Sequence, residues 1–64
     1  MAVVELAERR ASGIVVRLLW DSQRKQTIVR YRDRRNREAF VVDVPADRAL
    51  EAFEHPNVFR PKAA

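Results

Sequence analysis

The sequence predicts an α+β fold: a three-stranded antiparallel β-meander packed against a C-terminal α-helix, with a short N-terminal helix or edge strand before the first hairpin. Three observations predict it. Several short segments are rich in β-branched and aromatic residues, the connections between them are short and polar, and a helical apolar pattern follows Pro45. The 64 residues predict a single small domain, with an ordered core at about 3–59 and a tail at 60–64.

The segment 3–11 allows two interpretations. Val3, Leu6 and Ala7 have helical spacing, acidic residues come first and basic residues last, and Gly13 suits the left-handed residue that follows a helix. Such a helix would have only nine residues, so it would need tertiary support. The alternative is an extended segment that forms an edge strand.

The next part of the chain predicts strands and turns. Asp33 can begin a type I turn, and Asn36 tolerates a positive φ. Pro45 ends the last strand, Asp47 can cap the helix that follows, and Pro56 stops that helix at about His55. The predicted strands are 14–20, 27–32 and 39–44, and the predicted turns are 21–26 and 34–37.

Strand alternation assigns the side chains to two faces. Pairing Leu18 with Val29, and Tyr31 with Phe40, gives one almost wholly apolar face for the C-terminal helix to cover. Arg17 then lies opposite Arg30 on the second face, and like charges in that position destabilise a sheet. The second face carries Val15, Arg17, Leu19, Ile28, Arg30, Arg32, Val41 and Asp43.

Three arrangements of the second face remain open. The N-terminal helix could cover it and bring Glu5 and Glu8 to the arginines. A second copy of the chain could pack on it, or it could stay open as a ligand surface. Asp43, diagonal to Arg30, is expected to neutralise part of its charge.

Basic residues are concentrated in one stretch of the chain. Seven of the thirteen fall within 24–37, where Asp33 is the only acid. Such a focused positive field predicts an anionic partner, either nucleic acid or an acidic protein surface. With Arg17 from the second face, the candidate nucleic-acid-binding residues are Arg17, Arg24, Lys25, Arg30, Arg32, Arg34, Arg35 and Arg37.

A sheet backed by one C-terminal helix is similar in architecture to the DNA-binding domains of phage integrases and plant ethylene-response factors. Those domains insert the sheet into the major groove, but none of their sequence motifs occurs here. The alternative function is protein–protein interaction or homodimerisation through exposed strand edges. The candidate interaction residues are Val15, Leu19, Ile28 and Val41.

Other classes of function find little support in the composition. There is no cysteine and a single histidine, so we expect no disulfide, no ordinary zinc site and no cofactor. No catalytic motif can be assembled, so a non-enzymatic binding module is expected. No secretory signal or membrane-spanning run is found, which predicts a cytoplasmic protein without membrane contact.

The blocks Val16–Asp21 and Asp47–Pro56 resemble a group of short proteins from high-G+C Gram-positive bacteria. The resemblance covers roughly residues 5–59. No activity is known for the group, so the resemblance implies a cytoplasmic bacterial protein and assigns no functional residues.

Overall fold

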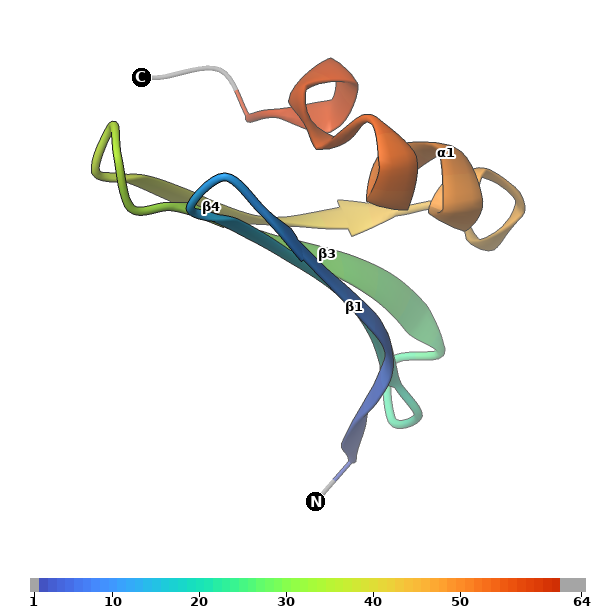
Figure 1. Ribbon diagram of the computed structural model, residues 1–64. Helices are drawn as coiled ribbons and strands as arrows, with labels where there is room; N and C mark the ends of the chain where they lie inside the picture. Colours follow the sequence, from blue (N-terminus) through green and yellow to red (C-terminus); the bar gives the residue numbers. More distant parts are fainter. Residues whose placement is uncertain (1, 62–64) are drawn as a thin grey trace.

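The computed structural model describes residues 2–61, which form a four-stranded antiparallel sheet with a short helical segment on one face (Figure 1). The strands lie in chain order across the sheet. The fold is α+β, as predicted, but the sheet has one strand more than the expected three-stranded meander. The elements are β1 (Val3–Ala11), β2 (Ile14–Asp21), β3 (Gln26–Asp33), β4 (Glu38–Val44), the 3₁₀ turn η1 (Ala46–Arg48), α1 (Ala49–Glu54) and the 3₁₀ turn η2 (Pro56–Phe59).

The N-terminal segment is the edge strand β1, so the prediction of a helix there is wrong and the edge-strand alternative is confirmed. β1 pairs with β2 along its whole length, with one bulge at Leu6. Ser12 and Gly13 have φ values of 52° and 81°. Positive φ at both central residues is typical of a two-residue type I′ hairpin turn. The left-handed glycine therefore closes a hairpin and does not end a helix.

The other two hairpins share one turn design. Asp21 ends β2 and Asp33 ends β3, and each Oδ1 accepts backbone N–H bonds from the residues two and three positions later, at 3.0 and 3.2 Å. The residue with positive φ is the last of each turn, Lys25 at 52° and Arg37 at 54°. The expectation of a positive φ at Asn36 is therefore wrong.

The strand register is the predicted one. Leu18 lies opposite Val29, and Tyr31 lies opposite Val16 on one side and Phe40 on the other. The rings of Tyr31 and Phe40 stack with centroids 4.8 Å apart. The helical segment covers this side of the sheet, which we call the helix face (Figure 1). The buried core consists of Val16, Val29, Tyr31, Val44 and Ala52.

The helical segment differs in detail from the prediction. Asp47 lies within η1 and makes no capping hydrogen bond, and the residue that precedes α1 is Arg48. The far end of α1 is held from β1: Arg9 donates hydrogen bonds to the carbonyls of Phe53 at 2.9 Å and Glu54 at 2.8 Å. A guanidinium at these carbonyls satisfies groups that the end of a helix leaves without partners.

The chain after η2 returns to the sheet. Arg60, where the tail was expected to begin, bonds to Glu38 and Asn57. Its guanidinium also lies over the rings of Tyr31 and Phe40, at 5.7 and 5.3 Å from their centroids. Residues 62–64 of the expected tail lie outside the described residues.

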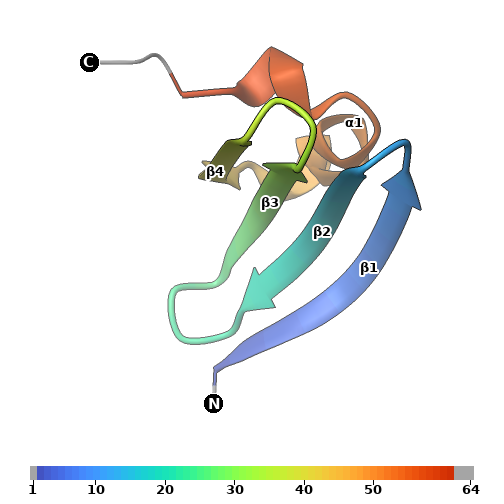
Figure 2. The ribbon, with the colours of Figure 1, turned by 60° about the vertical axis from the view of Figure 1, so that its left-hand side comes forward.

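The opposite side of the sheet, which we call the open face, is not covered by any described segment. Because the N-terminal residues form a strand of the sheet, the alternative in which an N-terminal helix covers this face is wrong. β1 and β2 bend around the open face (Figure 1), and Figure 2 looks onto it with α1 behind the strands. None of the helices among residues 2–61 is long and apolar enough to cross a membrane. The open face carries Glu5, Glu8 and Arg10 from β1, Val15, Arg17 and Leu19 from β2, Ile28, Arg30 and Arg32 from β3, and Val41 and Asp43 from β4.

Candidate functional site

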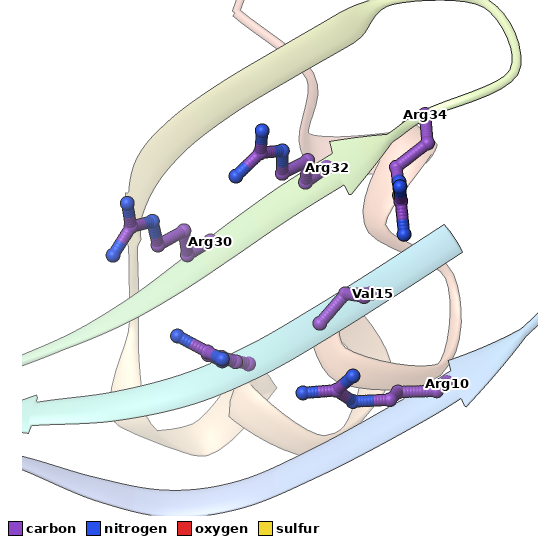
Figure 3. A pocket seen from close by; sticks show the side chains of 6 residues that line it. Arg10, Val15, Arg30, Arg32 and Arg34 are labelled. Atoms are coloured by element: carbon purple, nitrogen blue, oxygen red, sulfur yellow. The ribbon is translucent and has the colours of Figure 1, made fainter. Parts of the chain in front are cut away.

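A hollow of about 270 Å³ lies on the open face and is lined almost entirely by arginine. Figure 3 shows the guanidinium groups of Arg10, Arg30, Arg32 and Arg34 around Val15. We call this set of residues the arginine hollow. Its lining residues are Arg10, Val15, Arg17, Arg30, Arg32 and Arg34.

Strand register brings these side chains together. Arg30 and Arg32 are two residues apart on β3, so they project to the same side. Arg17 on β2 lies directly opposite Arg30, as predicted, and Arg10 on β1 lies opposite Val15. Arg34 follows β3, and its backbone N–H donates to the carbonyl of Gly13 at 3.0 Å. The hollow therefore draws on three adjacent strands and one turn.

Two carboxylates from β1 neutralise part of this charge. Glu8 accepts hydrogen bonds from Arg10 at 2.9 Å and Arg17 at 2.7 Å, and Glu5 lies 3.4 Å from Arg17. Two hydrogen bonds lower the pKa of Glu8: the larger effect comes from Arg10 and the smaller from Arg17. Glu5 and Glu8 do reach the arginines, but from a neighbouring strand and not from a helix lying over the face.

The remaining arginines of the hollow have no acidic partner. Within residues 2–61, Arg30, Arg32 and Arg34 form no ion pair. Asp43 does not neutralise Arg30 as expected, because it is bound by both terminal nitrogens of Arg24 at 3.1 Å. Five guanidinium groups and two carboxylates leave the hollow with a formal excess of three positive charges.

The predicted basic residues fall into two groups. Arg24 and Lys25 lie in the turn after β2, at the other end of the sheet from the arginine hollow. Arg24 bridges Asp21 and Asp43. Its hydrogen bonds to these carboxylates raise the pKa of Arg24, with the larger effect from Asp43 and the smaller from Asp21. Its charge is therefore matched locally, and the structure does not bring Arg24 or Lys25 into the hollow.

Arg35 and Arg37 lie in the turn beside Arg34. The Arg35 side chain packs against Gly13: a Cβ added to this glycine would lie 3.0 Å from the Arg35 Cγ. Arg37 is exposed and forms no ion pair among the described residues. Neither arginine lines the hollow, and both lie in the turn that follows β3.

Arg10 was missed by the sequence argument. It joins the hollow only because β1 is a strand, and the signal for that strand was the Ser12-Gly13 pair, which suits a two-residue hairpin turn.

The apolar candidates on the open face separate by exposure. Val15 and Leu19 are half-buried, Ile28 is buried at 7% exposure and Val41 is exposed at 58%. Ile28 lies between Leu19 and Asp43 in the register, so neighbouring strands shield it without a helix above. Val41 therefore remains as the exposed apolar side chain of this set.

The described residues contain no group of three His, Cys, Asp or Glu side chains that could hold a metal ion. No protein-family model, curated protein or solved structure matches the chain.

Proposed function

We propose that the chain is a small non-enzymatic binding module that holds nucleic acid through the phosphates, with the arginine hollow as its binding surface. The observation that carries the proposal is the opposition of Arg17 and Arg30 beside Arg32, with three more positive than negative charges in the hollow. Like charges placed this way destabilise a sheet. Glu8 and Glu5 relieve this for Arg17, but Arg30 and Arg32 have no acidic partner among the described residues. A bound anion removes that cost, and guanidinium groups bind phosphate oxygens in bidentate fashion.

The composition of the hollow favours an extended anion over a small metabolite. Small-molecule sites are mostly apolar concavities with a few polar groups. Here the lining is five arginines and one valine. A polyanion engages several guanidinium groups at once and releases counterions as it does so, which makes binding strongly dependent on salt.

The test is fluorescence anisotropy with labelled nucleic acid at low and near-physiological salt, using the variant Arg30→Gln/Arg32→Gln. We expect an affinity loss of about tenfold or more at low salt, and a salt slope reduced by about two because two phosphate contacts are removed. Equal affinity of the variant and the wild-type chain would contradict the proposal, as would the absence of any binding at low salt.

The matched control is Arg48→Gln/Arg60→Gln. It removes the same formal charge, but Arg48 pairs with Glu51 and Arg60 with Glu38 and Asn57, away from the hollow. A loss confined to the variant in the hollow assigns binding to this surface. Thermal unfolding of both variants checks that each remains folded.

A second candidate function, homodimerisation through β1, is favoured by a separate observation. The outer edge of β1 has no strand partner among the described residues, and Val4 and Leu6 are 53% and 55% exposed. Antiparallel pairing of two β1 strands about Ala7 would set Glu5 of one strand against Arg9 of the other. Sedimentation velocity tests this, with Leu6→Lys expected to abolish a dimer if the edge forms it.

A further inference from the structure

We infer that the arginine hollow selects double-stranded over single-stranded nucleic acid, contacting both phosphate backbones. This inference rests on the proposed function and specifies its ligand. It comes from three features of the open face: which side chains it lacks, how its positive charges are spread, and how the sheet bends.

The first feature is where the aromatic side chains lie. Tyr31 and Phe40 stack on each other on the helix face, beneath Arg60. Trp20 lies opposite Thr27 and Val4, whose side chains also point to that face. Phe53 and Phe59 belong to the helical segment and pack against the core. Among residues 2–61 the open face therefore presents no aromatic ring.

This distribution removes the main source of affinity for unpaired bases. Proteins that bind single strands stack successive bases on exposed aromatic rings, and each stacked base contributes substantially to affinity. The open face offers guanidinium groups, the carboxylates of Glu5, Glu8 and Asp43, and aliphatic side chains such as Val15 and Val41, but no ring. A duplex keeps its bases stacked on one another, so it loses nothing by meeting a surface without rings.

The second feature is the spread of charge across the strands. Arg10, Arg17 and Arg30 lie on β1, β2 and β3. With neighbouring strands about 4.8 Å apart, these positions span about 10 Å across the sheet. Arg30 and Arg32 add a spacing of about 7 Å along β3. The patch is thus two-dimensional. Arg30, Arg32 and Arg34 can meet one line of phosphates directly. Arg10 and Arg17, which share Glu8, meet a second line by exchanging this carboxylate for phosphate. The single line of an isolated strand supplies no such second contact.

The third feature is the shape of the sheet. β1 and β2 are bent with their convex side toward the helical segment, so the open face is concave (Figure 1). The bulge at Leu6 contributes to this bend, because an extra residue in an edge strand increases local curvature. A concave positive surface fits the convex rod of a duplex.

The experiment measures anisotropy of the full chain with a duplex of about 20 base pairs, roughly two helical turns, in DNA and RNA forms. The third probe is one DNA strand of the same length, chosen so that it does not self-pair. We expect at least one duplex to bind about tenfold tighter than the single strand at equal phosphate concentration. If neither duplex binds more tightly than the single strand, the inference is overturned while the proposed function remains intact. No binding of any probe overturns the proposed function itself.

The variant Val41→Tyr gives a second, independent readout. Val41 is exposed on β4 opposite Arg30, where tyrosine suits a strand and alters no charge. If the missing ring limits binding of single strands, Val41→Tyr should raise their affinity about fivefold and leave duplex affinity unchanged. An equal effect on both ligands would show that base stacking does not determine the preference. Phe in place of Tyr controls for the added hydroxyl.

Discussion

Arg17 and Arg30 lie directly opposite each other on β2 and β3, yet only Arg17 has an acidic partner, Glu8, at 2.7 Å. The two positions share a face and a charge but differ in their neighbours: Arg17 lies beside β1, and Arg30 lies between β2 and β4. The carboxylates of β1 thus occupy one side of the hollow as an internal substitute for phosphate. Arg30, Arg32 and Arg34 have no acidic partner among the described residues and are available to an external anion without displacing a carboxylate.

The first prediction concerns Glu8 as a competitor of phosphate for the arginines. Glu8→Gln frees Arg10, leaves Arg17 with Glu5 alone and raises the net charge by one. Affinity for duplex nucleic acid should therefore rise about two- to fivefold at low salt. Glu51→Gln is the matched control, because it makes the same charge change at the Arg48 pair on α1. A gain with Glu51→Gln as large as that with Glu8→Gln would show that net charge alone governs binding.

The second prediction compares the two aspartate turns. Asp33 is 4% exposed, while the Asp21 side chain is 13% exposed and also bonds to Arg24. Asp33→Asn and Asp21→Asn each weaken the acceptor for two backbone N–H groups. We expect the larger fall in the urea midpoint for Asp33→Asn, because its turn N–H groups have less access to water as a replacement partner. Equal midpoints for the two variants would contradict this.

The third prediction concerns pH. Burial by itself raises the pKa of Asp33, but hydrogen bonds from the backbone and side chain of Asn36 and the backbone of Arg35 outweigh it, so the pKa is lowered. A folded pKa below the unfolded value gives stability that is present above the unfolded pKa and is lost as pH falls through the folded one. Stability should therefore decline as pH drops below about 4, near the unpaired value for aspartate. Urea midpoints measured across this range should fall less steeply for Asp33→Asn.

The register of the central strands could be predicted because one alignment puts all their aromatic residues on one face and Arg17, Arg30 and Arg32 on the other. Leu18 opposite Val29 and Arg17 opposite Arg30 follow from that single condition. β1 offered no such condition. Its apolar residues Val3, Val4, Leu6 and Ala7 do not alternate with polar ones, and none of its nine residues is buried.

The partners of the arginines could be predicted only in part. Arg24 reaches Asp43 across 19 residues of sequence through a turn whose shape the sequence did not specify. The helix boundary was misplaced for a related reason, since the 3₁₀ turn η1 takes up the residues that were expected to begin the helix. The spacing of residues along a strand predicts which face each side chain occupies. Which residue a side chain in a turn contacts depends on the geometry of that turn.

The fourth prediction tests the β1–β2 turn, where Gly13 was expected to follow a helix. Gly13 has φ of 81°, and a Cβ there would lie 3.0 Å from the Arg35 Cγ. Gly13→Ala should destabilise the fold by about 1 kcal/mol or more, since a left-handed conformation is costly for alanine. Ser12→Asn should have the opposite sign, because asparagine before glycine is favoured in type I′ turns. Thermal unfolding followed by circular dichroism measures both, and destabilisation by both would argue against this turn.

The fifth prediction tests the contact that joins β1 to α1. Arg9 donates to the carbonyls of Phe53 and Glu54 and lies 5.6 Å from the centroid of the Phe53 ring. Arg9→Gln should lower the free energy of unfolding by about 1–2 kcal/mol, because the last carbonyls of α1 lose their charged donor and the ring loses a cation. Arg37→Gln is the matched control, since it removes the same charge from an exposed turn. Urea unfolding followed by Trp20 fluorescence gives both values. If Arg9→Gln unfolds at the same urea concentration as Arg37→Gln, then β1 does not stabilise the helical segment, and the edge strand is held by its pairing with β2 alone.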